Sequence, residues 1–364
     1  MLERLHLRQF RCFEELTLEP LPRHAVFVGD NAQGKTSILE AACLLMRLQS
    51  PRTSTRRDLI RHEAPHLVIE GRWHDTRLRF ACNQQTRRLA AGDRSSLPAA
   101  EYLGHSGLVV WIGNRDLQLV HGPAEQRRRF LDFVASQLFP PYRHALKAYE
   151  RALRSRNHLL KRHDPPPWRQ LDAYDQLLLD HGRILIESRH QLAAALRQPL
   201  DTAHRQLAAG DGATETAEAD YQPSVEAGQF AAALEQNRRE DTRLRQTTAG
   251  PHRDELDLRL NRRSAGRFGS EGQQRSLALA LKLAQAHLLH AHSGQPPMML
   301  IDDIFGELDP GRRNAFIGHL PADTQTLVTT THLDWLQQLP ADTRVFRVAD
   351  GRVEPVEPAS PAAD

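Results

Sequence analysis

The chain has 364 residues, 40% hydrophobic and 26% charged, with a formal net charge of +3 and an isoelectric point near 8.9. This length allows one large domain with an insertion, or two domains, and the mildly basic balance permits contact with nucleic acid without requiring it. No stretch approaches the roughly 18 apolar residues of a membrane span, so we expect no membrane partner.

The first third of the chain predicts an α/β structure. Charges at Glu3, Arg4 and Arg8 exclude the apolar core of a signal peptide, so we expect a cytoplasmic location. Strand patterns occur in the first eighteen residues and at 25–29, 67–73, 77–82 and 107–112, and a helix is expected from Ser37. The cysteines form no CxxC pair, so we interpret all three as packing residues: Cys12, Cys43 and Cys82.

From Pro123 the pattern becomes helical. An amphipathic helix that ends before Pro165 is indicated by apolar residues at 4-3-4 spacing, namely Tyr142, Leu146, Tyr149 and Leu153. A second long helix is expected from Trp168 to about Ala209, with leucines at seven-residue spacing: Leu171, Leu178, Leu185 and Leu192. We favour the face of a helical bundle over a coiled coil, because so few repeats are present.

The acidic segment 210–220 is expected to be a linker or exposed loop, and strand-like alternation returns at 255–260. The predicted fold class is therefore α/β, with mixed sheets, flanking helices and a core formed by both ends of the chain. The expected boundaries are 1–122 with 250–364 for the core, and 123–249 for an inserted helical arm or lid domain.

A phosphate-binding loop is the most specific local motif. GDNAQGKT follows the apolar run AVFV and satisfies GxxxxGK[ST] in a strand–loop–helix context. The glycines let backbone N–H groups face phosphate oxygens, the lysine adds a compact cation, and the threonine hydroxyl can ligate Mg²⁺. The alternative is a glycine-rich turn without a ligand. The expected nucleotide-binding residues are Gly29, Asp30, Asn31, Ala32, Gln33, Gly34, Lys35, Thr36 and Ser37.

Two adjacent carboxylates end the apolar run at 298–303, MMLIDD. Alone, this pattern is typical of a strand that ends in a solvated turn. A P-loop, however, requires a partner strand that ends in a carboxylate for Mg²⁺. We therefore assign Asp302 to the metal, together with Thr36, and Asp303 as the base that orients water.

Ser270 and Gln273 fit the S-x-x-Q capping box, which predicts a well-capped helix over SLALALKLAQAHLL. This serine-glycine-glutamine helix start, ahead of the carboxylate strand, also resembles the signature loop of the ATP-binding-cassette (ABC) ATPases. The resemblance implies that Ser270, Gly272 and Gln273 meet the γ-phosphate of an ATP held by another P-loop. Likewise, Glu307-Leu308-Asp309 resembles the D-loop of these ATPases, which adds Asp309 to the nucleotide site, and His332 resembles their switch histidine.

Within that class the chain resembles the RecF family of bacterial recombination-repair proteins, which is related to the SMC group. The resemblance covers essentially the whole chain: LHLRQFRCFEELTLE, GDNAQGKTSILEA, GPAEQRRRFLD, AGPHRDEL, SEGQQRSLALALKLA, LIDDIFGELD and TTTH. It implies an ABC-type P-loop core, ATP-dependent homodimerisation, weak DNA-stimulated ATPase activity, and DNA binding at single-strand gaps or junctions. It further implies cooperation with RecO and RecR in loading RecA, and so roles in gap repair, replication restart and SOS induction.

Two positions depart from the family pattern. The family usually has Pro-Glu before Asp-Leu where this chain has Asn114-Arg115, in the segment that corresponds to the Q-loop. Glu271 stands where an uncharged residue is expected. A carboxylate there would repel a γ-phosphate, so we expect its side chain to point away from the nucleotide.

One P-loop and one signature helix per chain predict a symmetric dimer with two ATP molecules, in which Lys35, Asp302, Asp303 and His332 serve catalysis. Because Asp303 is shorter than the usual glutamate, we expect slow turnover. DNA contacts are expected from Arg127, Arg128, Arg129, Arg151 and Arg154, although an arginine-rich helix face is more often simply solvated.

Three other classes compete with this interpretation. A transporter ATPase would lack so long a helical insertion, and an SMC-type structural protein would need hundreds of residues of heptads between its halves. A DNA-binding module without ATP use would leave the P-loop motif unexplained.

Overall fold

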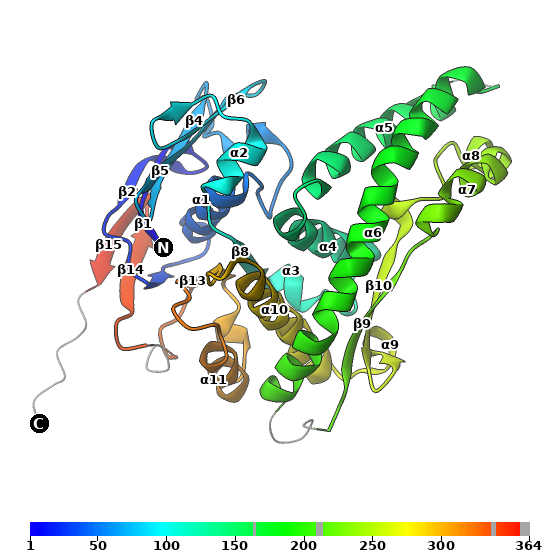
Figure 1. The fold of residues 1–364 in the computed structure, drawn as a ribbon. Helices are drawn as coiled ribbons and strands as arrows, with labels where there is room; N and C mark the ends of the chain where they lie inside the picture. The colour runs from blue at the N-terminus through cyan, green and yellow to red at the C-terminus, as the bar shows by residue number, and fades with distance from the viewer. Residues whose placement is uncertain (163–164, 209–213, 336–339, 357–364) are drawn as a thin grey trace, which may run out of the picture. The chain divides into compact units, whose positions relative to one another are not determined.

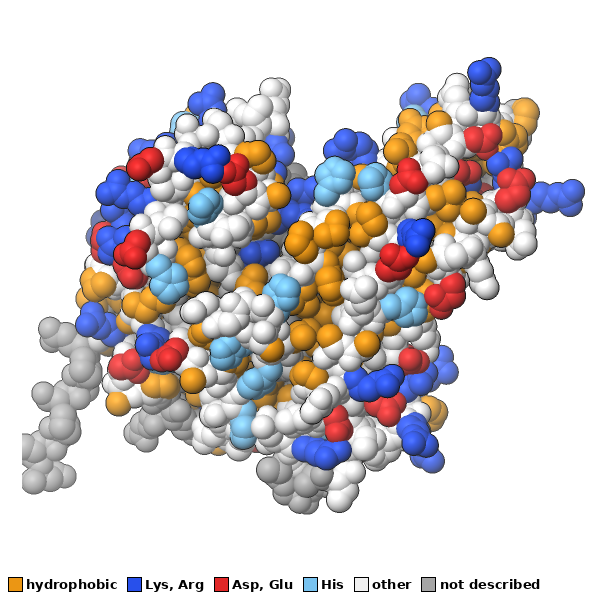
Figure 2. Space-filling model, in the orientation of Figure 1, with side chains coloured by type: hydrophobic (Ala, Val, Ile, Leu, Met, Phe, Trp, Pro, Cys, Tyr) orange, Lys and Arg blue, Asp and Glu red, His pale blue; other side chains and the backbone are white. Residues whose placement is uncertain are grey.

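The computed structural model describes residues 1–162, 165–208, 214–335 and 340–356 (Figure 1 and Figure 2), and it divides into two compact units. Unit 1 comprises Met1–Asp116 with Leu289–Asp364, and unit 2 comprises Leu117–Leu288. Segment 250–288 therefore lies in unit 2 rather than with the chain ends. The two units are defined by contacts, so they do not test the domain boundaries expected from the sequence, which stay a prediction.

An antiparallel six-stranded sheet forms the first layer of unit 1, in the order β2-β1-β4-β5-β6-β7. Its strands are β1 (Leu2–Phe10), β2 (Phe13–Leu18), β4 (Leu67–Trp73), β5 (Thr76–Cys82), β6 (Arg87–Ala91) and β7 (Arg94–Ser95). Alternation places Leu5, Leu7 and Ile69 on the buried face and polar residues on the other. The strands expected in this region from the sequence are confirmed, whereas β6 and β7 were missed.

The second sheet of unit 1 has the order β15-β14-β3-β13-β12-β8, in which all neighbours are parallel except β14 and β15. Its strands are β3 (His24–Val28), β8 (Val109–Gly113), β12 (Met298–Asp302), β13 (Thr326–Thr330), β14 (Arg344–Ala349) and β15 (Arg352–Val356). The strands that precede the P-loop and the carboxylate pair are thus separated by one strand, β13. In such sheets, ligands bind beyond the carboxyl ends of the strands.

Helix α1 (Lys35–Arg47) lies between the two sheets of unit 1, and all of its residues except Thr36 are buried. This burial on every side explains its continuous apolar sequence. The other helical segments of unit 1 are η1 (Arg56–Leu59), α2 (Ala99–Gly104), η4 (Phe305–Glu307) and α11 (Pro310–Gly318). Helices α3 (Asn114–Leu117) and α10 (Glu271–Ser293) cross the boundaries between the units.

Unit 2 is built on the helices α4 (Ala124–Leu138), α5 (Tyr142–Arg162) and α6 (Trp168–Leu207), of which α5 and α6 form a hairpin (Figure 1). A small sheet, β11-β10-β9, contains β9 (Ala217–Gln222), β10 (Glu255–Leu260) and β11 (Arg263–Ser264). Short helical segments complete the unit: η2 (Ala227–Gln229), α7 (Phe230–Gln236), α8 (Arg238–Leu244), η3 (Pro251–Arg253) and α9 (Ala265–Phe268).

The helical predictions for unit 2 are confirmed in their essentials. The four leucines at seven-residue spacing in α6 are at most 1% exposed. The buried face of α5 also contains Arg156, whose guanidinium donates to Asp175 (2.5 Å), Asp241 (2.6 Å) and Thr247 (2.9 Å). A buried arginine is tolerated there because two carboxylates compensate its charge.

Two sequence-based interpretations were wrong. Within the supposed linker 210–220, residues 217–220 belong to β9, which pairs with β10, while 210–213 lie outside the described residues. The small residues Ala217 and Ala219 alternate inward there, a weak apolar signal that acidic neighbours obscured. Cys43 and Cys82 are buried as expected, but Cys12 is exposed.

Candidate nucleotide-binding site

The candidate P-loop connects β3 to α1 at the carboxyl end of the parallel strands. Two of its glycines are sterically required. A Cβ on Gly29 would lie 2.2 Å from the carbonyl oxygen of Val348 in β14. Gly34 has φ of +103°, and a Cβ there would lie 2.6 Å from the sulfur of Cys12. The loop also packs against the β14–β15 turn, where Gln33 Oε1 accepts from the Asp350 N–H at 2.7 Å.

Lys35 folds back over this loop. Its Nζ donates to the carbonyl oxygens of Gly29 (2.6 Å) and Asp30 (2.8 Å). Burial lowers the pKa of the ammonium group, while Asp303, Asp302 and Asp30 oppose that shift. The lysine is thus held close to two carboxylates at the point where an anionic ligand would meet the loop.

Asp302, the last residue of β12, lies in hydrogen-bond contact with two hydroxyl groups. Its Oδ1 accepts from Thr36 (2.7 Å) and from Thr329 of β13 (2.8 Å). Burial raises the pKa of the Asp302 carboxyl, and these two hydrogen bonds oppose the rise. The structure therefore brings together the metal residues that the sequence suggested, Thr36 and Asp302.

Asp303 follows with a left-handed backbone, φ of 53°, which an aspartate tolerates better than most residues. Its N–H donates to Thr329 Oγ1 at 3.0 Å, and its backbone N also lies 3.2 Å from the Thr329 carbonyl oxygen. The Asp303 carboxylate is half-buried, and the hydroxyls of Thr36 and Thr329 donate to Asp302 instead.

The donor set fits Mg²⁺. Threonine hydroxyl and carboxylate oxygens are the hard ligands that this ion prefers, and in P-loop sites it usually keeps several waters and substrate oxygens as well. Within the described residues no cluster of three or more His, Cys, Asp and Glu side chains could hold a metal alone.

The signature segment lies in unit 2, where the capping box forms as expected. Gln273 Oε1 accepts from the Ser270 N–H at 2.7 Å, and the Gln273 N–H donates to Ser270 Oγ at 3.2 Å. Gln273 Nε2 also donates to Glu215 at 2.5 Å, and the second oxygen of Glu215 lies 3.2 Å from His204 Nε2 in α6. Ser270 itself is exposed at the start of α10.

The other residues singled out in the sequence differ in the contacts that they make. Asp309 caps α11, since it accepts from the N–H (2.9 Å) and the guanidinium (2.8 Å) of Arg312, and these contacts lower its pKa. His332 is exposed, and its backbone bonds to Thr330 Oγ1. Glu271 is exposed and pairs with Arg275 at 2.7 Å along the same helix. Asp116 accepts from the Gly113 N–H at 2.8 Å in the Q-loop segment.

The five candidate DNA-binding arginines are unequal. Arg127 is largely committed to structure, because it donates twice to Glu255 (2.6 and 2.7 Å) and also to the carbonyls of Leu119 and Gly122. Arg128 donates to the Asp254 carbonyl at 2.8 Å, and burial lowers its pKa.

The other three lie on exposed helix surface. Arg129 pairs with Glu125 at 2.5 Å, Arg154 lies 4.0 Å from Glu150, and Arg151 is exposed.

Sequence reasoning missed two groups at the site. Thr329 lies in the run TLVTTT, whose hydroxyls were not assigned, although it is a direct partner of Asp302. Arg52 stands close enough to lower the pKa of Asp302 and also lies 3.4 Å from the fully buried Glu40, which Arg11 binds through two hydrogen bonds. Only the fold places these residues beside the P-loop.

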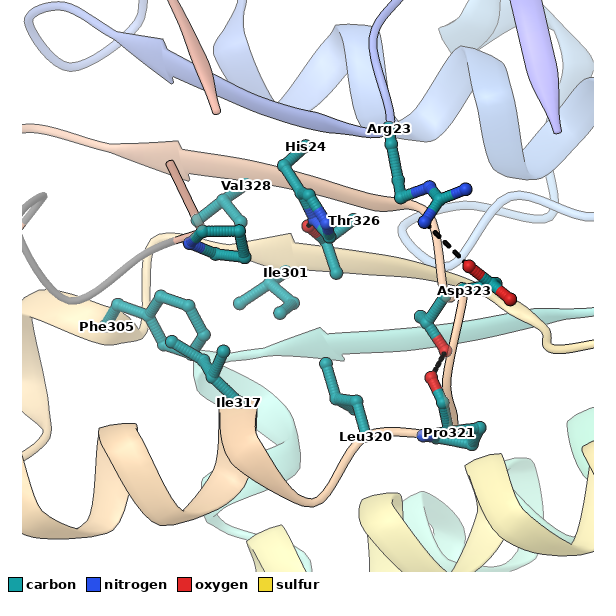
Figure 3. A pocket seen from close by; sticks show the side chains of 12 residues that line it. Arg23, His24, Ile301, Phe305, Ile317, Leu320, Pro321, Asp323, Thr326 and Val328 are labelled. Atoms are coloured by element: carbon teal, nitrogen blue, oxygen red, sulfur yellow. Dashed lines mark hydrogen bonds and ion pairs between the residues drawn. The ribbon is translucent and has the colours of Figure 1, made fainter. Parts of the chain in front are cut away.

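A separate pocket of about 120 Å³ lies between the parallel sheet and the end of α11 (Figure 3). It is lined by His24 and Thr326, which begin β3 and β13, and by the Arg23–Asp323 ion pair at 2.7 Å. No residue of the P-loop lines this pocket, so it is not the nucleotide site.

Several known proteins are similar to this chain in sequence. A family model described as an AAA domain matches residues 4–89. A DNA replication and repair protein RecF from Lactococcus lactis is 34% identical over 358 residues, which cover 97% of this chain and 98% of the relative. Another protein of that name, from Microcystis aeruginosa, is 35% identical over 380 residues, with 97% and 99% covered.

Solved structures resemble the fold. One, described as the recombination mediator protein RecF-ATPrS in the RecFOR pathway, superposes with a TM-score of 0.84 at 24% identity and covers 98% of both chains. An SMC head bound to the C-terminal winged-helix domain of ScpA gives a TM-score of 0.54 at 14% identity, with 98% and 96% covered. These likenesses confirm the predicted fold class, an α/β ABC-type ATPase fold with a helical insertion.

Among the described residues, no helix is long and apolar enough to span a membrane.

Proposed function

The chain belongs to the RecF family of DNA replication and repair proteins, and on that basis we propose that it is an ATP-dependent DNA clamp. In this proposal ATP joins two copies into a dimer that binds DNA at single-strand gaps or junctions. Slow, DNA-stimulated hydrolysis releases the dimer. With RecO and RecR, the clamp promotes loading of RecA in the cytoplasm, and so serves gap repair, replication restart and SOS induction.

The observation that carries the proposal is the assembled Thr36–Asp302 pair beside Lys35 and the P-loop. These groups supply backbone donors, a cation and hard oxygen ligands, which are the requirements for binding a nucleoside triphosphate. Mg²⁺, when bound by Thr36 and Asp302 with the nucleotide, would neutralise phosphate charge. We assign binding of the nucleotide phosphates to residues 29–37.

Asp303 is proposed to orient the attacking water, and His332 to sense the γ-phosphate. Aspartate has a shorter side chain than the glutamate usual in this class, so water is held less closely and turnover is expected to be slow.

The signature segment supports the dimer. Ser270 Oγ accepts from the Gln273 N–H, so its own proton remains available to an incoming γ-phosphate oxygen. A helix N-terminus also favours an anion. Because each chain carries one P-loop and one signature helix, two chains related by a twofold axis would complete two sites, to which Gly272, Gln273 and Asp309 would also contribute. By linkage, ATP then shifts the population toward the dimer.

The direct test is the mass of the full-length protein by sedimentation with ATP and Mg²⁺, with ADP, and without nucleotide. We expect a dimer with ATP alone. Ser270→Arg should abolish dimerisation while leaving ATP binding to the monomer, whereas Lys35→Met should reduce ATP binding itself. A monomer under every condition would contradict the clamp.

The helical unit argues against an SMC-type structural protein. The longest helix, α6, has 40 residues, which corresponds to about 60 Å and is far short of an SMC arm. The nucleotide motifs by themselves would also fit a transporter ATPase subunit.

A further inference from the structure

A hollow of about 570 Å³ lies on the exposed face of the antiparallel sheet in unit 1. It crosses β1, β4, β5 and β6, on the side of the sheet opposite α1. The orientation is fixed by Gly71, where a Cβ would lie 2.6 Å from Leu45 of α1. Residues that alternate with the inward-facing positions therefore point into the hollow.

The strand register places two arginines at the ends of one row across the hollow. Arg8 pairs with Val68, Val68 with Ala81, and Ala81 with Arg88. Three steps of roughly 4.8 Å separate Arg8 from Arg88, so their Cα atoms lie about 14 Å apart. The two residues between them are small and form a low floor. Far apart in sequence, these residues meet only through strand pairing.

A third arginine, Arg79, enters the hollow from the adjacent row, where it pairs with Glu70 at 3.1 Å. Arg8 and Arg88 are exposed, and neither side chain has an ion pair or hydrogen bond within the described residues. The acidic cross-strand neighbour of Arg8 is Glu15, which instead lies 3.6 Å from His6. Within the described residues, the hollow thus carries two arginines that form no ion pair.

The next row continues the positive charge. Arg4, Arg72 and Arg77 are cross-strand neighbours, an arrangement of like charges that is destabilising by itself. Glu3 and Glu19 offset Arg4 and Arg72, whereas Arg77 has no ion pair within the described part of the chain.

The shape favours a polyanion over a small anion. A small-molecule site encloses its ligand and presents a few converging polar groups. This hollow is open, spreads over four strands, and has a floor of Val68, Ala81 and Ala90. Arginine binds phosphate oxygens by paired N–H donors, and a duplex presents closely spaced phosphates along its whole length.

We propose that this hollow is a DNA-backbone contact surface, in which Arg8 and Arg88, with Arg79 between them, bind phosphates. The proposal rests on the DNA binding put forward above and places part of it on the sheet rather than on the arginines of α4 and α5. Because one chain provides the whole surface, it contributes in the monomer as well as in the ATP dimer.

The test is anisotropy of a fluorescent gapped duplex with the full-length protein, titrated between 50 and 200 mM salt, with ATP and without nucleotide. The variant is Arg8→Ala with Arg88→Ala. The matched control is Arg183→Ala with Arg205→Ala, which removes the same charge from exposed surface of α6, at positions outside the candidate DNA-binding arginines. Sedimentation with ATP and a melting curve verify that both variants fold and dimerise like the wild type.

We expect the Arg8/Arg88 variant to bind at least 10-fold more weakly at low salt, with a salt slope smaller by about 2, since each phosphate contact contributes about 1. The control should change by less than twofold. Wild-type protein that fails to bind DNA would refute the proposed function itself. Normal DNA binding and slope in the Arg8/Arg88 variant, or equal losses in both pairs, would overturn the assignment of the hollow alone. Binding to polyglutamate is measured in parallel as a model of an acidic protein. If the Arg8/Arg88 variant loses this binding but keeps its DNA binding, the hollow is assigned to an acidic protein partner instead of DNA.

Discussion

The hydroxyl of Thr36 and the carboxylate of Asp302 share a hydrogen bond of 2.7 Å across 266 residues of sequence. The contact joins the first turn of α1 to the end of β12, and Thr329 binds the same carboxylate oxygen from β13. Three elements therefore converge on one atom.

The first prediction concerns Asp302→Asn. Burial of the ionised carboxylate is unfavourable, and asparagine keeps an oxygen acceptor for both threonines, so the unliganded variant should melt at an equal or higher temperature. It should lose the metal ligand, however. We expect the rise in melting temperature with Mg²⁺ and ATP to fall to less than half of the wild-type value.

The control for this prediction is Asp342→Asn, an exposed carboxylate at the other end of the sheet, 4.0 Å from His24. It should keep the full ATP-dependent rise. A full rise in Asp302→Asn would show that Asp302 is not a ligand of the nucleotide-bound metal.

Cys12 provides a probe of the P-loop. Its sulfur packs against Gly34, and it is the exposed cysteine of the three, whereas Cys43 and Cys82 are buried. Burial raises the pKa of the Cys12 thiol, so alkylation should be slow at neutral pH and faster near pH 9. We expect iodoacetamide to modify Cys12 first, and Mg²⁺ with ATP to slow this reaction at least fivefold.

Mass spectrometry of peptides measures this protection, with the two buried cysteines as internal references. A Cys12→Ser variant should bind ATP normally and lose the fast-reacting site. Equal rates of Cys12 alkylation with and without ATP would place the nucleotide away from Gly34.

The Gln273–Glu215 contact predicts a role for a residue outside every motif. Glu215 accepts from Gln273 at 2.5 Å and also faces His204 in α6, so it fixes the start of the signature helix. Glu215→Ala should leave ATP binding to the monomer unchanged, yet weaken ATP-dependent dimerisation about tenfold, as expected for a lost hydrogen bond to a charged group.

Glu218→Ala, three residues further along the chain and within β9, is the matched control and should dimerise normally. The two variants are compared by nucleotide titration and by sedimentation with ATP. A dimer of wild-type affinity in Glu215→Ala would show that Gln273 is positioned by the capping box alone.

His252 predicts a pH-dependent stability. Its ring bonds to the Tyr149 hydroxyl at 2.7 Å and to the Thr247 carbonyl at 3.0 Å, and burial lowers its pKa to about 4. The folded state therefore binds the proton less tightly than the unfolded chain. Stability contributed by the neutral ring is complete above about pH 6.5 and is lost as the pH falls toward 4, by at most about 3 kcal/mol.

Denaturant unfolding of wild type and His252→Gln at pH 7.5, 6 and 5 measures this effect. The glutamine variant should be less stable at pH 7.5, and the difference should shrink at pH 5. A constant difference would mean that His252 is accessible to protons in the folded protein.

Local sequence patterns determined the elements and the phosphate site. Gly29, Gly34, Lys35 and Thr36 all lie within the single segment 29–36, so the loop that they form follows from backbone sterics and from the strand and helix on either side. The same holds for the Ser270–Gln273 capping box and for the buried leucines of α6, because spacing along one helix fixes which side chains share a face. The fold class followed from the order of these elements.

Contacts between distant segments could be decided only by the tertiary structure. Thr329 contacts Asp302 because β12 and β13 pair in the register that places these two residues side by side. Segment 217–222 forms the strand β9 because it pairs with β10. Arg127, Arg156 and Arg88 have the same side chain, yet the first two are bound by carboxylates while the third is exposed and forms no ion pair within the described residues. Folding decides the burial and the neighbouring charges of a charged side chain, because both come from residues far along the sequence. The chemistry of the P-loop could therefore be predicted from the sequence, whereas the role of each arginine could not.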